Sequence, residues 1–252
     1  MLSKRLPIYQ TISILVFFLI WAMVAYFAKS VLLPGPVEVF HVLWKAIATG
    51  DLMQHLSVTL LRVIAAFLLA MSVGCALGLL MGRSHVADRL LDPWLIVFLN
   101  IPALVVIILA YVWFGLTEAA AIGAVAVNKI PNVAVTIREG ARALDRQLDE
   151  MADVYRFTFY QRLVHVILPQ LQPYIAAASR SGLSLIWKIV LVVEMLGRSS
   201  GIGFQLNLFF QLFDVASILA HSSAFTAITL FIELIIVQPY ERYATRWRLA
   251  RA

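Results

Sequence analysis

The sequence predicts an all-α integral membrane protein with about six transmembrane helices, in a single domain over residues 1–252. Two observations carry this prediction. Hydrophobic residues make up 62% of the chain and charged residues only 13%, whereas soluble domains are nearer half apolar and a quarter charged. Apolar runs of roughly 20 residues, the length that crosses a bilayer, recur along the chain and with their loops use nearly all of it. We therefore expect no separate soluble catalytic domain.

The first expected span, about residues 8–31, follows the basic pair Lys4 and Arg5. A signal peptide also begins this way, but its apolar core is usually about 7–15 residues long, so we expect an uncleaved helix. Two prolines and a glycine at 34–36 end this helix. Residues 37–56 mix polar and apolar side chains and are expected to form a short helix at the outer surface.

The second expected span, about residues 57–82, carries Gly74, Gly78 and Gly82 at four-residue intervals. Residues four apart lie on one helix face, and small residues there let the backbone of another helix approach closely. Glycine is common in membrane helices generally, but three glycines in register favour close packing.

The third expected span, about residues 93–114, is interrupted by Asn100-Ile101-Pro102. Proline removes a backbone donor and strains the preceding turn of a helix, so we expect a kink at this point. Three further spans are expected at about 119–137, 174–196 and 215–237.

Charged and amide side chains inside these spans are candidates for a translocation path, because such groups are costly in a bilayer and are usually functional or paired. We expect Lys129, deep in the fourth span, to face a path that favours an anionic solute, and Glu194 to contribute to an outer gate. A structural ion pair, or a lysine that reaches the headgroups, is an equally good interpretation. The predicted path residues are Asn100, Asn128, Lys129, Asn132 and Glu194, and no role in the path is given to Arg180 or Lys188.

The longest polar interval, residues 138–173, contains five Arg and five Asp or Glu. Its apolar residues recur at helical spacing, which predicts an amphipathic helix from Glu150 to about Leu163, with Glu150 near its start complementing the helix dipole. Such a helix lies on lipid headgroups or binds a soluble partner. The near balance of acids and bases favours a partner, since an anionic lipid surface attracts surplus lysine. The apolar stripe consists of Met151, Val154, Tyr155, Phe159, Leu163, Val166 and Ile167.

Lysine and arginine are distributed unevenly between the two sides of the expected topology. With the N-terminus inside, the inner segments hold 13 Lys and Arg and the outer segments hold three. Cytoplasmic loops carry such a surplus, so both termini and residues 138–173 are expected in the cytoplasm. The same surplus accounts for the net charge of +6 without a nucleic-acid partner.

Motifs for catalysis, nucleotide binding and metal binding are absent from the sequence. No Gly-x4-Gly-Lys-Ser/Thr occurs, so the chain has no P-loop to hold a nucleotide. The five histidines are scattered, and no paired carboxylates or nucleophile arrangement occurs, so we expect neither an enzyme nor a metal site. An ion-coupled secondary transporter that works without an ATPase is the alternative function. It would need inverted repeats, and residues 1–115 show no such symmetry with residues 116–252.

Within the polar interval, Glu150-x-Ala152 is followed by Leu168-Pro169, and Glu150 and Pro169 are nineteen residues apart. This pattern resembles the EAA loop of permease subunits in binding-protein-dependent ABC importers. Further segments are similar, in the same order, to the sulfonate, taurine and nitrate branch of that family. These segments are Leu33-Pro34-Gly35-Pro36, Ser57-x-Thr59-Leu60-Leu61-Arg62, residues 78–84, Leu91-Asp92-Pro93, Ile101-Pro102, Trp113-Phe114-Gly115 and Glu194-Met195-x6-Gly201-Ile202-Gly203.

The resemblance implies a type I ABC importer permease fold and a translocation subunit for a small polar or anionic solute, such as a sulfonate, taurine, nitrate or bicarbonate. The implied partners are two ATP-binding cassette ATPase subunits, which bind the ATP, a second copy of the chain, and an extracytoplasmic solute-binding protein. The implied location is the bacterial cytoplasmic (inner) membrane, with residues 138–173 as a cytoplasmic coupling loop. The ATPase-coupling residues carried over by the motif are Glu150, Met151, Ala152, Tyr155, Arg156, Phe159, Leu168 and Pro169.

Two residues of the loop depart from the family pattern. Met151 replaces an alanine, which is a mild change. Arg156 takes the place of a glycine that would allow φ > 0 at a bend between two short helices. The helix therefore either continues through Arg156 or bends with a different construction.

Overall fold

The computed structural model describes residues 6–30 and 32–249, so Lys4, Arg5 and Arg251, which entered the charge count, lie outside the described residues. The structure is helical throughout these ranges and contains no strand in them. Two π-helical turns, η1 and η2, interrupt the later helices. The described elements are α1 Leu6–Ala28, α2 Pro36–Thr49, α3 Asp51–Arg83, α4 His85–Asn100, α5 Ala103–Phe114, α6 Glu118–Arg142, α7 Arg146–Val154, α8 Phe159–Arg162, η1 Leu163–Ile167, α9 Leu168–Gly197, α10 Ile202–Gln211, α11 Val215–Ile232, η2 Glu233–Val237 and α12 Gln238–Leu249.

The prediction of an all-α membrane protein is confirmed. Within the described residues, four helical segments are long and apolar enough to cross a membrane, and the α4–α5 pair adds a fifth if its two bent halves count as one span. The first expected span, α1, contains a shorter apolar stretch, Ile12–Ala28. The expected number of about six is therefore reached only when both α1 and the bent pair are counted. The four segments are Asp51–Arg83, Glu118–Arg142, Phe159–Gly197 and Val215–Ala244.

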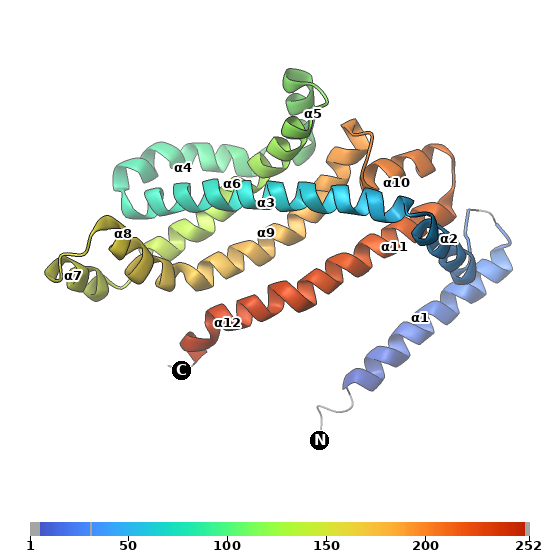
Figure 1. Cartoon of the computed structure of the whole chain (residues 1–252), viewed down its shortest axis with the longest axis horizontal. Helices are drawn as coiled ribbons and strands as arrows, with labels where there is room; N and C mark the ends of the chain where they lie inside the picture. The colour runs from blue at the N-terminus through green and yellow to red at the C-terminus, as the bar shows by residue number, and fades with distance from the viewer. Residues whose placement is uncertain (1–5, 31, 250–252) are drawn as a thin grey trace.

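Helices α3 and α6 form the most extensive contact of the bundle, and α9 packs against both (Figure 1). The glycine face of α3 lies directly on α6. A Cβ atom added at Gly78 would stand 2.5 Å from the carbonyl oxygen of Ala134, and one added at Gly74 would stand 2.6 Å from Cβ of Val133. The close packing predicted for this face is therefore confirmed.

The predicted kink in the third span is a complete break. Helix α4 ends at Asn100, and α5 starts at Ala103 with its axis turned by 98°. Ile101, the residue before Pro102, takes an extended conformation with φ −71° and ψ 126°. The residue before a proline is disfavoured in the α region, and Pro102 has no N–H to continue the helix. The sequence predicted the position of the interruption, but the angle between the two halves is larger than that of a kink.

The helices leave different structures at the two ends of the bundle. Helices α7 and α8 lie together at one end, whereas α2 and α10 lie toward the other, where α1 extends away from the body (Figure 1). The main apolar core lies between α3, α6 and α9 and includes Val63, Val125 and Ile186. The hairpin of α7 and α8 is thus separated from α2 and α10 by the length of the bundle.

Candidate functional site

The hairpin formed by α7 and α8 contains the residues of the predicted coupling loop. Asp145 caps α7 by accepting a hydrogen bond from the backbone N–H of Gln147 at 2.8 Å. Glu150 lies in the second turn and forms an ion pair with Arg146 at 2.8 Å. The expectation that Glu150 complements the helix dipole is therefore wrong, because this effect is confined to the first turn, where Asp145 supplies the cap instead.

Arg156 adopts a left-handed conformation, with φ +51°. Its N–H donates to the carbonyl of Asp153 at 3.0 Å, and the N–H of Phe157 donates to the carbonyl of Ala152 at 2.9 Å. This pair of hydrogen bonds is a Schellman motif, which ends a helix and usually has glycine at the left-handed position. The bend that a glycine would allow is therefore present, and it is built with arginine.

The bend divides the apolar stripe between three elements. Met151 and Val154 belong to α7, Phe159 opens α8, and Val166 and Ile167 lie buried in η1. The prediction of one amphipathic helix from residue 150 to about 163 is wrong, because the left-handed residue and the capping box of α8 at Thr158 stop and restart the helix.

Substitutions at Arg156 test this bend. A side chain with a Cβ in the left-handed region costs about 1–2 kcal/mol, and β-branching makes this worse. Arginine already carries a Cβ, so we expect Arg156→Val to lower the free energy of unfolding by only the added cost of β-branching, about 1 kcal/mol, and Arg156→Gly to leave it unchanged or raise it by up to about 1 kcal/mol. Denaturant unfolding of the detergent-solubilised chain measures both. Equal stability of the two variants would contradict the left-handed conformation.

Several large apolar side chains of the hairpin are exposed. Val154, Tyr155, Phe159 and Tyr160 retain 79%, 71%, 81% and 71% of their accessible surface, and Met151 is partly exposed. Ala152 is buried. We call these four strongly exposed side chains the hairpin patch. They lie beyond the ends of α6 and α9, on a segment rich in charged residues.

Ion pairs fix the hairpin to the bundle. Arg83, at the end of α3, forms an ion pair with Asp149 of α7 at 2.7 Å. Arg162 of α8 donates to the carbonyl oxygen of Asp149 at 3.1 Å and also pairs with Asp153. Sequence reasoning missed Asp149 and Arg162, because Arg83 lies 66 residues before Asp149 and no local pattern indicates its partner.

The last two residues of the predicted loop belong to α9 and not to the hairpin. Leu168 and Pro169 form the first turn of α9, directly after η1. Pro169 has no N–H to donate to the π-helical turn that precedes it. These two residues lie inside the helical segment Phe159–Gly197 and are not part of the hairpin patch.

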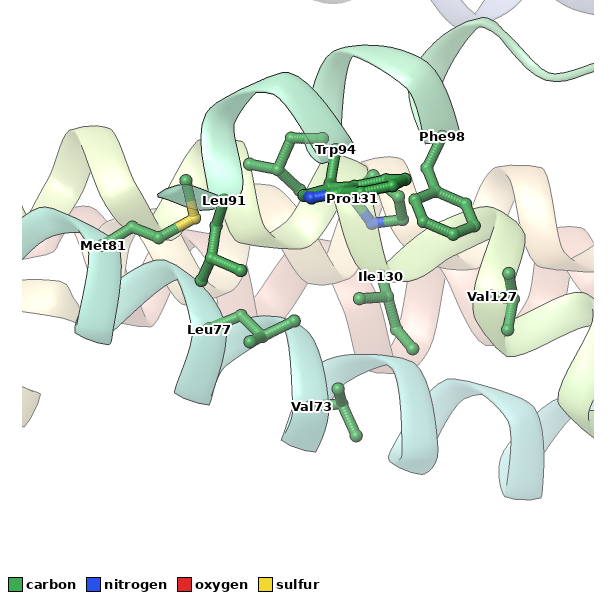
Figure 2. Close-up of a pocket in the computed structure, with 10 residues that line it drawn as sticks. Val73, Leu77, Met81, Leu91, Trp94, Phe98, Val127, Ile130 and Pro131 are labelled. Carbon is green, nitrogen blue, oxygen red and sulfur yellow. The ribbon is translucent and has the colours of Figure 1, made fainter. Parts of the chain in front are cut away.

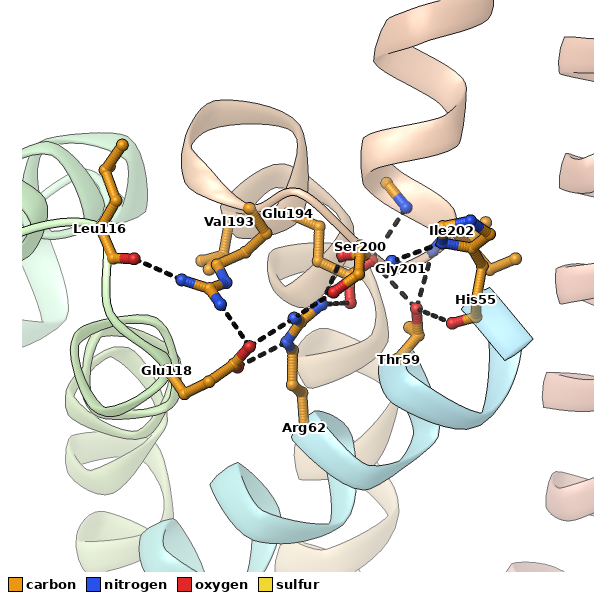
Figure 3. Close-up of polar contacts among 12 residues, drawn as sticks. His55, Thr59, Arg62, Leu116, Glu118, Val193, Glu194, Ser200, Gly201 and Ile202 are labelled. Carbon is orange, nitrogen blue, oxygen red and sulfur yellow. Dashed lines mark hydrogen bonds and ion pairs between the residues drawn. The ribbon is translucent and has the colours of Figure 1, made fainter. Parts of the chain in front are cut away.

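A buried polar network occupies the opposite end of the bundle (Figure 3). The guanidinium of Arg62 donates to Glu118 and to Glu194, at 2.7 Å in each case. Glu194 is fully buried and also accepts hydrogen bonds from Thr59 at 3.0 Å and from the N–H of Gly203 at 2.9 Å. Buried charges need such pairing, and the network joins α3, α6, α9 and α10.

The loop before α10 is held by the same network. The N–H of Gly201 donates to His55 at 3.0 Å, and the N–H of Ile202 donates to Thr59 at 2.8 Å. Arg62 reaches the carbonyl of Ser200 at 2.6 Å, and Arg198 pairs with Glu118. One face of α3 carries His55, Thr59 and Arg62. Their spacing in the sequence indicates that they share this face, but it does not indicate which residues they contact.

The other predicted path residues do not join Glu194. Asn100, Asn128 and Asn132 each donate their side-chain amide to a carbonyl of their own helix. Lys129 is 98% buried beside Gly182, being only 2% exposed, and makes no hydrogen bond or ion pair with the residues that the structure describes. A translocation path through these five residues stays a prediction.

An apolar cavity lies between α3, α4 and α6 (Figure 2). It has a volume of about 260 Å³, and it is lined by Trp94 and Phe98 of α4, Leu77 of α3 and Pro131 of α6, among others. None of its lining residues is charged or hydroxylated. A polar solute would lose its hydration there without compensation, so this cavity is not a candidate site for one.

The structure is that of a multi-pass membrane protein, with a buried ion-pair network at one end of its membrane-crossing helices and a projecting hairpin at the other. The described residues contain no group of three or more His, Cys, Asp or Glu side chains that could hold a metal ion. The chain belongs to the family described as the binding-protein-dependent transport system inner membrane component, whose model matches residues 74–248. It is therefore an ABC transporter permease with the type I fold, and its family consists of transport proteins rather than enzymes.

Curated relatives support the same branch that the sequence motifs indicated. The chain is 33% identical to SsuC of Bacillus subtilis, described as an aliphatic sulfonates transport permease protein, over 71% of this chain and 64% of that protein. It is 26% identical to TauC of Escherichia coli, a taurine transport system permease protein, over 79% of this chain and 72% of that one. It is 27% identical to CmpB of Synechococcus elongatus, a bicarbonate transport system permease protein, over 76% of this chain and 73% of that one. The resemblance to the sulfonate, taurine and nitrate branch is confirmed.

A solved structure shares the fold. It is described as the crystal structure of an amino acid ABC transporter with histidines, and it superposes with a TM-score of 0.63 over 80% of this chain and 97% of that one, at 22% identity. At this identity the likeness concerns the fold alone.

Proposed function

We propose that the chain is the translocation subunit of an ATP-driven importer for a small polar or anionic solute, and that the hairpin of α7 and α8 is the surface on which a separate ATPase docks. The observation that carries this proposal is the hairpin patch, four large apolar side chains exposed beyond the membrane-crossing helices. Burial of one such side chain contributes about 1.5–3 kcal/mol. A soluble partner that covers Tyr155 and Phe159 gains this energy, and aromatic residues dominate the energetics of protein interfaces.

The rigidity of the hairpin supports a docking role. Its ion pairs with Arg83 and within α7–α8 hold the patch in place before any partner arrives, and a preorganised surface loses less conformational entropy on binding. The balance of five Arg and five Asp or Glu in residues 138–173 is unlike that of a helix on an anionic lipid surface, which is rich in lysine and arginine.

The proposed assembly follows from what the chain lacks. With no P-loop in its sequence, the chain depends on two ATPase subunits to bind ATP. Its few spans are too few to enclose a path alone, which favours a symmetric dimer with a second copy. A solute-binding protein delivers the substrate on the extracytoplasmic face of a bacterial cytoplasmic membrane. The relatives described as sulfonate, taurine and bicarbonate permeases support a small polar or anionic solute as the substrate class.

Charge substitution in the hairpin patch tests the proposal. We expect Phe159→Asp to weaken association with the ATPase by at least about tenfold, which corresponds to about 1.4 kcal/mol, and to abolish transport-coupled ATP hydrolysis in proteoliposomes. Val86→Asp is the matched control, since Val86 is an exposed apolar residue in the first turn of α4 and lies outside the patch. It should associate normally. Unchanged association of Phe159→Asp would contradict docking on the hairpin patch, and uptake without any ATPase would favour the ion-coupled secondary transporter instead.

A further inference from the structure

A groove of about 400 Å³ lies between α9, α10 and α11, and it differs from the apolar cavity beside α4 in its lining. Four hydroxyl side chains and two charged ones face it from the two membrane-crossing helices. These six residues are Ser184 and Lys188 of α9 and Ser222, Thr226, Thr229 and Glu233 of the α11–η2 segment. We call them the polar groove residues.

The spacing of these residues places them on matching stripes. Ser184 and Lys188 are four residues apart, and Arg180 lies one turn before them, so all three share one face of α9. On α11 the corresponding residues recur at intervals of four, three and four, which also keeps them on one face. The two stripes face each other, because Arg180 forms an ion pair with Glu233 across the gap at 3.2 Å.

The charges along the groove are unequally compensated. At one end, the single guanidinium of Arg180 pairs with the carboxylates of both Glu233 and Glu241, at 3.2 and 2.7 Å. Lys188, toward the other end, makes no hydrogen bond or ion pair with any described residue. The side chain of Lys188 is exposed in the groove, and a charged side chain on a membrane-crossing helix is usually functional or paired. The groove therefore has an uncompensated positive charge at Lys188.

Two hydroxyl groups that line the groove with Lys188 are available as donors. The hydroxyls of Ser184 and Thr229 donate to carbonyls of their own helices, at 3.2 and 2.9 Å. Those of Ser222 and Thr226 make no hydrogen bond within the described residues, although both line the groove. Because α9 and α11 run antiparallel, these two hydroxyls lie on the part of α11 that is away from Glu233, as Lys188 lies on the part of α9 that is away from Arg180.

We propose that this groove binds an organic anion in the membrane-spanning part of the protein. The ammonium of Lys188 and the hydroxyls of Ser222 and Thr226 hold its oxyanion headgroup through charge-assisted hydrogen bonds, and Trp187, Phe225 and Leu230, which also line the groove, contact its apolar body. Apolar walls with a few converging polar groups are typical of small-molecule sites. This inference rests on the proposed transport function and names its substrate class, an oxyanion that carries a short apolar chain.

Ligand-observed NMR with the full chain in nanodiscs of zwitterionic lipid tests the proposal, with 1-propanesulfonate as the probe. We expect saturation transfer to the methyl group of 1-propanesulfonate, weakened at least about tenfold in affinity by Lys188→Met and largely retained by Lys188→Arg. Lys45→Met is the matched control, because it removes one exposed lysine from α2, outside the groove. Empty nanodiscs correct for partition of the probe into lipid. Propylammonium, which has the same chain and the opposite charge, should not compete.

Three results would overturn the proposal: no saturation transfer from the wild-type chain at millimolar probe, equal affinity in Lys188→Met and Lys45→Met, or effective competition by propylammonium. Correct folding of Lys188→Met is established by an unchanged thermal melting curve, and Lys188→Arg keeps the test independent of that variant. The experiment contains no ATPase. Failure of anion binding therefore leaves the docking test of the hairpin patch unaffected, and loss of ATPase docking leaves anion binding unaffected.

Discussion

Gly78→Leu is expected to lower the free energy of unfolding by about 3 kcal/mol or more, at the upper end of overpacking effects, and to reduce the yield of folded chain. The reason is the contact between α3 and α6. Even a Cβ atom at Gly78 would lie 2.5 Å from the carbonyl oxygen of Ala134 and 3.0 Å from the backbone nitrogen of Arg138. Backbone atoms cannot rotate away as a side chain can, so the two helices must separate. Fluorescence-detected size-exclusion chromatography after heating measures the loss.

Gly123→Leu is the matched control for this experiment. It makes the same change on α6, but no atom lies within 4 Å of a Cβ added there. A helical glycine costs about 0.5–1 kcal/mol relative to alanine, so this variant should be as stable as the wild type or slightly more stable. A similar loss in both variants would mean that the effect comes from the leucine itself and not from the helix crossing.

Glu194→Leu is expected to destabilise the protein by about 3–5 kcal/mol, the usual cost of removing one partner of a buried ion pair. Glu194 is fully buried, and its loss leaves the N–H of Gly203 without an acceptor and removes one of the two acceptors of Arg62 Nη1. The melting temperature in detergent should fall accordingly. Glu194→Gln keeps an acceptor oxygen and should fall between the wild type and Glu194→Leu.

Glu38→Leu serves as the control, since it removes an exposed carboxylate from the first turn of α2. Surface substitutions of this kind usually stay within about 0.5 kcal/mol. If Glu194→Leu melts at the same temperature as Glu38→Leu, the network contributes little to the folded state and the paired arrangement at Arg62 is incorrect.

The two ends of the bundle are joined by the same helices. α3 carries Arg62 in the polar network and Arg83 at the hairpin, which are about 31 Å apart along the axis at about 1.5 Å per residue. α6 and α9 also run from the hairpin to Glu118 and Glu194. In the proposed importer, a movement of the hairpin is therefore passed to three helices that share one buried network.

Local patterns predicted much of this structure. Apolar runs located the spans, Pro102 located the break between α4 and α5, and the glycine interval on α3 identified a close-packed face. Each of these predictions depends on a property of a few neighbouring residues: the missing N–H of proline, the missing Cβ of glycine, or the hydrophobicity of a run of side chains. The motif around Glu150 likewise located the hairpin. The bend inside the hairpin places Arg156 in a left-handed conformation that arginine disfavours, and the Schellman hydrogen bonds maintain it.

Partners in three dimensions could not be predicted from such patterns. Glu194 pairs with Arg62 across 132 residues of sequence, and Asp149 pairs with Arg83 across 66. Lys188 has no local feature that distinguishes it from a lysine reaching the headgroups, and it gains significance only from the hydroxyls that α11 places opposite it. Helical periodicity tells which residues share a face, because that follows from the geometry of one helix. Which helix faces meet depends on how the whole bundle packs. Only the tertiary structure therefore decided the polar network, the ion pairs that hold the hairpin, and the groove between α9 and α11.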